Sequence, residues 1–511
     1  MFTWLFGSGD KPPIFLQFRS SKTFIIIVVA SAVFTDIFAY GIVVPVFPFA
    51  LTERADIHED DVQTWVSIFL AVYGAALLVA SPICGWLADR MQSRQASFLL
   101  GLLALGGSTA LLCAGSSIAM FAAGRVLQGV SAAVVWVTGL ALLVDTVGPD
   151  EIGSAMGYIG LSMSLAILLA PLLGGVVFAE AGYYSVYAMA FGLIVLDLFL
   201  RFAMVERKVA KKWLPDLVIA SSEKGMLSNE QQQHDKEPES SGRVSHSDCV
   251  ELPEKFDSRH SSDHSDSSPA PISSHLSLTQ RVVARLPPVV FLFGSRRILA
   301  VLWACTMQAS LLTSFDATLP LFVKSTFGWD SIGAGLIFLP VVLASFIGPV
   351  IGKLSDKYGP RWLATSGFIL ACPFLILLRL VNENSINHKV MLCALLALIG
   401  LGLTLALTPI MAEISYAVDA KAKRRPPGFF GKNGAYAQAY GLFNMAWACG
   451  SMIGPLLGGL VNSSEGWPTA TLILGCVSIF TALPTVIWTG GSIFKLRRKQ
   501  QQAPADESHL A

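Results

Sequence analysis

Long apolar runs separated by short polar segments set the pattern of this chain. The runs are close to, or longer than, the roughly 20 residues that a helix needs to cross a bilayer. Helices are expected because lipid offers no partner to an unpaired backbone group. The pattern predicts an all-α membrane protein with twelve transmembrane helices, at residues 24–49, 63–88, 96–115, 118–145, 153–179, 184–204, 296–323, 331–352, 363–381, 389–416, 435–461 and 467–490.

The two halves of the chain carry the same motifs in the same order. The ten residues from Ser81 recur 267 positions later from Gly348, and the six from Ala170 recur 284 positions later from Gly454. Six helices per half give both copies the same orientation, so the repeat axis runs along the membrane normal. We therefore expect two pseudo-symmetric six-helix bundles, over residues 24–204 and 296–490.

The segment between the bundles, residues 205–295, has a different composition. It is rich in Ser, Asp, Glu, Gln and His and has almost no aromatic residues, so it cannot bury a core. It is predicted to be a disordered cytosolic linker whose basic start, at Arg207 and Lys208, lies on anionic headgroups. Its histidines are irregularly spaced and do not predict a metal site.

Lysine and arginine are distributed unevenly between the two ends of the predicted helices. Outside the linker, seventeen lie on the side shared by both termini and four lie on the opposite side. Because the more positive side faces the cytosol, the N-terminal segment 1–23 and the tail 491–511 are both predicted to be cytosolic.

The composition changes the picture in three further ways. Only 14% of the residues are charged, against about a quarter in soluble proteins, and the net charge of +1 indicates no nucleic-acid partner. No cysteine lies in a predicted outer loop, so no disulfide framework is expected. Asn462 begins a glycosylation sequon in a short outer loop.

Charged residues inside the predicted spans are the first candidates for function, because a charge at mid-membrane is costly. Asp36 lies in the middle of the first span, one turn from Tyr40, which could share its hydrogen bonding. Asp316 has a related place in the seventh span. A carboxyl group at such depth suits proton transfer, although a structural bond between helices is the alternative. Glu413 is a weaker candidate near the cytosolic end of the tenth span.

Arg125 is the second anomaly. It shares one helical face with Gln128, and it must meet a polar cavity or a carboxylate because a guanidinium keeps its proton. It could tune an acid, clamp an anionic substrate, or bond to backbone carbonyls. Asp197 and Arg201, spaced four apart, are expected to pair with each other.

Aromatic and amide side chains in the spans are candidates for a substrate cavity. They are Phe38, Tyr40, Gln128, Trp136, Asn444 and Trp447. Packing against lipid explains the aromatic members equally well.

Small residues and prolines form a further pattern. Gly450, Gly454 and Gly458 line one helical face, and Pro171 and Pro455 each remove one backbone hydrogen bond. A kinked, glycine-faced helix is either a pivot between the halves or a site of static close packing.

Four motifs, in order over residues 24–490, resemble those of the major facilitator superfamily, and specifically its twelve-span drug:proton antiporters. The loop after the second span resembles the superfamily's loop motif at Gly85, Leu87, Ala88, Asp89, Arg90 and Arg94, with Gln92 and Ser93 as departures. Its second copy has Gly352, Leu354, Asp356, Lys357, Gly359 and Arg361. The fourth-span motif is Arg125 to Gly129. The antiporter motif is matched at Ala166, Ala170, Pro171, Gly174 and Gly175, and again at Gly450, Gly454, Pro455, Gly458 and Gly459.

Within this group the chain looks most similar to vesicular amine transporters and to fungal exporters of toxins and secondary metabolites. Residues Asp36 to Pro45 and Asp316 to Pro320 carry that likeness. Tyr73 and Asn444 stand where the amine transporters have charged residues, which favours the fungal exporters.

The resemblance implies a proton-coupled exporter of drugs, toxins or secondary metabolites that works by alternating access, with a cytosolic latch in the loop motifs. It implies no cofactor, a proton gradient as the energy source, a small-molecule substrate and a monomer in the bilayer. The plasma membrane is expected, with a vacuolar or vesicle membrane as the alternative. An uptake facilitator or symporter, and a non-transporting sensor, remain the alternative functions; no motif indicates an enzyme.

Overall fold

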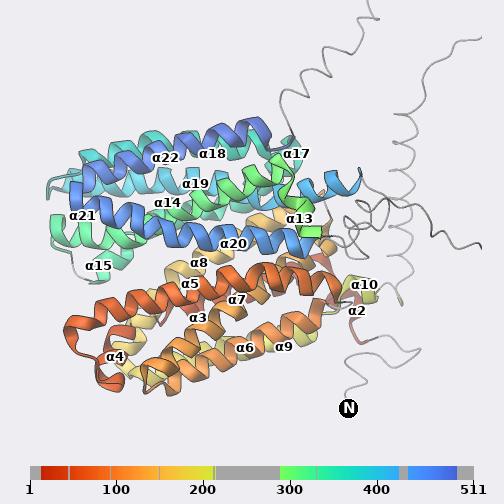
Figure 1. Cartoon of the computed structure of the whole chain (residues 1–511), viewed down its shortest axis with the longest axis horizontal. Coiled ribbons are helices and arrows are strands. Elements are labelled where there is room, and N and C mark those ends of the chain that lie inside the picture. Colours follow the sequence, from red (N-terminus) through yellow and green to blue (C-terminus); the bar gives the residue numbers. More distant parts are fainter. Residues whose placement is uncertain are drawn as a thin grey trace, which may run out of the picture. The chain divides into compact units, whose positions relative to one another are not determined.

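The computed structural model describes residues 13–43, 46–91, 94–148, 150–210, 213, 288–329, 331–424 and 435–491. Within these residues all regular structure is helical, which confirms the predicted all-α fold. The N-terminal bundle is coloured red to yellow and the C-terminal bundle green to blue (Figure 1). Both belong to one compact unit.

The N-terminal bundle follows the predicted spans closely. Its helices are α2 (Leu16–Arg19), α3 (Lys22–Gly41), α4 (Phe47–Ala55), α5 (Glu59–Arg90), α6 (Arg94–Ala114), α7 (Ile118–Val147), α8 (Ile152–Ala181), α9 (Tyr183–Ala203) and α10 (Arg207–Ala210). The predicted first span, 24–49, is divided into α3 and α4. Two prolines follow α3 in the sequence, at 45 and 48, and a residue before proline avoids helical geometry.

The C-terminal bundle has more interruptions. Its helices are α13 (Pro288–Phe293), α14 (Arg296–Phe327), α15 (Ser331–Leu336), α16 (Leu339–Leu343), α17 (Gly348–Tyr358), α18 (Pro360–Leu377), α19 (Ile386–Ala422), α20 (Tyr436–Pro455), α21 (Val461–Glu465) and α22 (Trp467–Trp488). Short 3₁₀ turns lie at Ala344–Ile347 and Leu378–Leu380, and a π-helical turn, η3, lies at Leu456–Leu460.

Eleven helices within the described residues are long and apolar enough to cross a membrane. The predicted eleventh span, 435–461, is broken into α20, the π turn and α21, because Pro455 ends the regular hydrogen-bond ladder. The eighth span is likewise broken, and α16 and α17 each begin with a proline in the first turn.

Two helix pairs make the most extensive contacts between the bundles. Helix α5 packs along α20, and α17 packs along α8. Both contacts involve the end of the molecule that carries Asp89 and Asp356, together with Arg94, Lys208 and Arg361. We call this the basic end, and the opposite end the outer end.

Candidate functional site

Asp36 lies in the middle of α3, and its side chain is 1% exposed. One carboxylate oxygen, Oδ2, accepts a hydrogen bond from Nε1 of Trp136 on α7, at 3.2 Å. The other oxygen, Oδ1, has no hydrogen-bond partner among the described residues. No cation bonds to this carboxyl group directly, although Arg201 lies within electrostatic range. The sequence correctly predicted that Asp36 lies inside the bundle. It identified Trp136 only as a candidate for lining the substrate cavity, and not as the hydrogen-bond partner of Asp36.

Tyr40 does not share the hydrogen bonding of Asp36. Its ring packs against that of Tyr73 on α5, with centroids 4.6 Å apart and the ring planes tilted by 39°. Tyr73 in turn lies within electrostatic range of both Asp36 and Arg125. Tyrosines therefore occupy the space between the carboxyl group and the guanidinium in this bundle.

Arg125 is completely buried and has no carboxylate beside it. Its Nη1 donates to Oε1 of Gln128 at 2.8 Å, as the shared helical face predicted. Its guanidinium lies over the rings of Phe47, at 4.3 Å, and Tyr40, at 5.2 Å. Nε and Nη2 have no hydrogen-bond partner among the described residues, so this charge is held by aromatic faces.

The two remaining acidic candidates lie in different surroundings. Asp316 is exposed on α14 and close enough to Tyr40 of the other bundle to act on it electrostatically. Glu413 is completely buried at the basic end. It accepts two bonds from Arg297, through Nε at 2.5 Å and Nη2 at 2.8 Å, and one from the backbone N–H of Gly490.

The other substrate-cavity candidates lie in three different settings. Phe38 is 2% exposed and packs in the core of the N-terminal bundle, while Trp447 on α20 is half-buried. Asn444 donates from Nδ2 to Oγ of Ser81 on α5, at 2.9 Å. Asn444 is thus part of the contact between bundles.

Asp89, at the end of α5, binds the first turn of α20. Its oxygens accept bonds from the backbone N–H groups of Ala437, at 3.1 Å, and Gln438, at 3.0 Å. Arg94 donates to the same carboxylate at 3.2 Å and pairs with Asp145 at 3.1 Å. A carboxylate suits this position because the first amides of a helix lack intrahelical partners and carry positive charge.

Asp356 repeats this arrangement in the C-terminal bundle. It accepts bonds from the backbone N–H groups of Gly153, at 2.7 Å, and Ser154, at 2.9 Å, in the first turn of α8. The hydroxyl of Tyr416 donates to it at 2.7 Å. We call these two arrangements the Asp89 latch and the Asp356 latch. Together they hold the bundles together at the basic end.

Glycines allow the backbones to meet at both latches. A Cβ atom on Gly352 would lie 2.0 Å from the carbonyl oxygen of Gly153, and one on Gly85 would lie 2.6 Å from that of Ala437. The sequence motifs predicted Gly85 and Gly352, but they did not identify Gly153, Ala437 or Tyr416 as partners.

Three other basic residues of the loop motifs lie outside the latches. Arg90 stacks on Trp86 at 3.8 Å, and Lys357 lies 5.1 Å from the ring centre of Tyr358. Arg361 donates from Nε to the carbonyl oxygen of Thr489 at 2.7 Å, and so holds the end of α22. Gln92 and Ser93 lie outside the described residues.

The glycine face of α20 formed by Gly450 and Gly454 packs inside its own bundle. Cβ atoms on Gly450 and Gly454, or on Gly458 in η3, would collide with α14, at Thr306, Ser310 and Ser314. Gly174 approaches Ile42 closely, whereas Gly175 has no neighbour within 4 Å and Gly459 only one, at that limit. Pro171 lies within continuous α8. These residues make close contacts within each bundle, which favours the static-packing interpretation.

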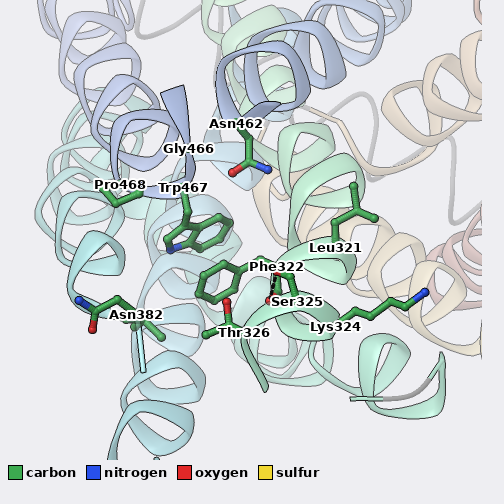
Figure 2. Close-up of a pocket in the computed structure, with 11 residues that line it drawn as sticks. Leu321, Phe322, Lys324, Ser325, Thr326, Asn382, Asn462, Gly466, Trp467 and Pro468 are labelled. Carbon is green, nitrogen blue, oxygen red and sulfur yellow. Dashed lines mark hydrogen bonds between the residues drawn. The ribbon is translucent and has the colours of Figure 1, made fainter. Parts of the chain in front are cut away.

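A cavity of about 630 Å³ lies at the outer end of the C-terminal bundle. Figure 2 shows the stacked rings of Phe322 and Trp467, 4.0 Å apart, with Lys324 pointing away from them. Asn462 lines this cavity from the short helix α21. None of the charged candidates contributes to the cavity, so we do not assign the transport site to it. The described residues contain no cluster suited to a metal ion.

Comparisons with known proteins agree with this geometry. The model of the Major Facilitator Superfamily matches residues 29–431. The chain belongs to this superfamily. Its members are transporters, so the protein is a multi-pass membrane transporter and not an enzyme.

Two fungal relatives match over nearly the whole chain. The uncharacterised MFS-type transporter C18.02 of Schizosaccharomyces pombe is 34% identical, over 91% of this chain and 95% of its own. The MFS-type transporter ppzB of Metarhizium rileyi is 33% identical, over 93% and 96%. The class B tetracycline resistance protein of Escherichia coli is 23% identical, over 70% and 73%.

A solved structure supports the fold. The human organic anion transporter MFSD10 (TETRAN) superimposes with a TM-score of 0.61, over 91% of this chain and 100% of its own, at 15% identity. At that identity the likeness confirms the superfamily fold and leaves the substrate open.

Proposed function

We propose that this transporter exports small amphipathic organic molecules in exchange for protons. The observation that carries the proposal is Asp36, a fully buried carboxyl group with one oxygen bound by Trp136 and the other free of protein partners. Ionisable groups at this depth are rare and mark proton or substrate paths. A group with no fixed cation can take and release a proton without breaking a salt bridge.

Asp316 supplies a second carboxyl group, on the opposite bundle. Asp316 is exposed, whereas Asp36 is buried. Asp316 acts electrostatically on Tyr40, which lies one helical turn from Asp36. We propose that one carboxyl group takes the proton while the other attracts the charged part of the substrate.

The latches and the charge distribution support the proposed direction of transport. Both latches hold the basic end together, and the excess of Lys and Arg at that end favours the cytosol. In this conformation protons reach the bundles from the outer side. We propose the plasma membrane, with a vacuolar or vesicle membrane as the alternative, cytosolic termini and a monomeric transporter.

The energy available is sufficient for export. One proton crossing about 100 mV releases about 2.3 kcal/mol. At about 1.4 kcal/mol per tenfold change, this supports a substrate gradient of roughly fifty-fold per proton. The relation to a tetracycline resistance protein supports a drug-like substrate.

The test is proton movement in vesicles that contain the purified protein and a pH-sensitive dye. A panel of amphipathic drugs and metabolites is added under an imposed pH gradient. We expect substrate-triggered proton flux in the wild type, and a loss of at least about tenfold in Asp36→Asn, because the amide cannot carry the proton.

Asp56→Asn is the matched control. Asp56 has a φ of 53°, which asparagine also tolerates, and it lies just after α4 at the outer end. It should behave as the wild type does. Substrate movement that ignores the pH gradient, in the wild type and in Asp36→Asn alike, would show a facilitator and overturn the proposal.

A further inference from the structure

The start of the linker remains attached to the N-terminal bundle after α9 ends. Glu206 is 3% exposed, and its carboxylate accepts the backbone N–H of Gln95 at 2.6 Å. The side chain of Gln95 donates to the carbonyl oxygens of Arg201 and Met204. Residues 204–210 are therefore ordered on the first turn of α6, although the composition predicted a disordered linker from 205.

The two cations at the start of α10 contact the bundle rather than extending away from it. Lys208 Nζ pairs with Oδ2 of Asp145 at 3.0 Å, and Arg207 donates to the carbonyl oxygen of Thr146 at 3.1 Å. Both acceptors lie at the last turn of α7, where the helix end is negative. The contact of Arg207 and Lys208 with lipid headgroups stays a prediction.

Asp145 connects Lys208 to the Asp89 latch. The same oxygen of Asp145 accepts Arg94 Nε at 3.1 Å, and the other end of that guanidinium pairs with Asp89. The exposed fractions of the side chains are 2% for Arg94, 5% for Asp89 and 10% for Asp145, so little water screens these charges.

The charge balance of this network depends on Lys208. Among Asp89, Asp145, Arg94 and Lys208 there are two carboxylates and two cations. Without Lys208, the nearly buried carboxylate of Asp145 would lose one of the two cations that the described residues place on it, and an under-compensated buried charge is costly. Arg94 would then be drawn toward Asp145 and would hold Asp89 less firmly.

A related contact lies at the start of α14, just after the linker. Glu413 follows Asp145 by 268 positions, close to the repeat spacing of the loop motifs, and pairs with Arg297. Lys208 and Arg297 thus each place a cation on the repeat-related acid of their own bundle.

We propose that Lys208 is a positioning residue of the transport cycle, which acts through Asp145 and Arg94 to keep Asp89 bound to the first turn of α20. Residues 205–210 then belong to the Asp89 latch and not to a passive tether. The inference depends on the latch geometry and not on the substrate or on proton coupling.

Hydrogen exchange measured by mass spectrometry tests this on the full-length protein in lipid nanodiscs. The readout is exchange in the first turn of α20, residues 435–440, whose amides bind Asp89. In Lys208→Glu we expect exchange there to rise by up to about fivefold, the range of a partly exposed ion pair. Lys208→Arg should restore the wild-type rate, because it keeps the charge.

Lys353→Glu is the matched control. Lys353 is an exposed cation on α17 at the same end, and the structure records no ion pair for it. It should leave residues 435–440 at the wild-type rate. Wild-type exchange in Lys208→Glu, or a Lys208→Arg variant as fast as Lys208→Glu, would overturn the proposal.

A general folding defect would also raise hydrogen exchange in α9, which holds the buried Asp197–Arg201 pair. If α9 also exchanges faster in Lys208→Glu, the same exchange is measured in the milder variant Lys208→Gln, to separate a folding defect from a weakened latch. Faster exchange at 435–440 with α9 protected supports the proposal, and unchanged exchange at 435–440 contradicts it.

Discussion

At the scale of single residues, the N-terminal bundle contains both paired and unpaired buried charges. Asp197 and Arg201 are paired at 2.8 Å, with both side chains completely buried. Asp36 and Arg125 are equally deep but have no partner of opposite charge bonded to them. We expect the paired residues to stabilise the fold, and we propose that the unpaired ones change partners during transport.

We expect Asp197→Ala to destabilise the protein by about 3–5 kcal/mol, because it leaves Arg201 buried without its partner. Thermal unfolding of the purified protein measures this. Lys22→Ala is the control, since the Lys22–Glu151 pair is largely exposed and is worth at most about 1 kcal/mol. Equal falls in Tm for the two variants would show that the buried pair is not structural.

At the scale of helices, the contact between α17 and α8 is a backbone contact. Gly352 lies against the carbonyl oxygen of Gly153, where a Cβ atom has no room. Because the obstacle is backbone, no side-chain rotation relieves it. The same holds where Gly441 on α20 meets the carbonyl oxygen of Ser81 on α5.

We expect Gly352→Ala to shift the protein away from the closed basic end. Spin labels on two exposed positions, Leu87 on α5 and Trp362 on α18, report the distance between bundles. The variant should show a larger population of long distances. Gly175→Ala makes the same chemical change on α8, where no atom lies within 4 Å, and should match the wild type. A wild-type distance distribution in Gly352→Ala would contradict the expectation.

The sequence predicted helices better than it predicted contacts. Apolar length and the repeated loop motif located the spans, Asp89 and Asp356. The partners of Asp89 are backbone amides 348 and 349 residues away, and no side-chain pattern marks a backbone donor. The Asn444–Ser81 bond was missed because it depends on how the bundles meet, and the folded start of the linker was missed because it depends on how residues 204–210 pack on α6 and α7.

At the scale of the whole molecule, two latches related by the repeat hold one end of the protein together. Each places a carboxylate from one bundle on the first turn of a helix in the other, and each therefore opposes the same motion. If the bundles move as rigid bodies, the latches cannot open independently, because the helices that carry them are packed within their own bundles.

Asp89→Asn distinguishes a concerted motion from local fraying. The amide weakens the bond to the first turn of α20 and leaves the Asp356 latch chemically intact. We expect hydrogen exchange to rise at residues 435–440 and also at residues 152–156, the first turn of α8, because loss of one latch shifts the shared equilibrium toward the open basic end. Asp356→Asn should produce the reciprocal effect. In each variant the exchange rate should rise by a similar factor at residues 435–440 and at residues 152–156, because both sites report the same opening motion. Exchange that rises only at the mutated latch would instead show two independent contacts, and the alternating-access interpretation of the basic end would then lose its structural support.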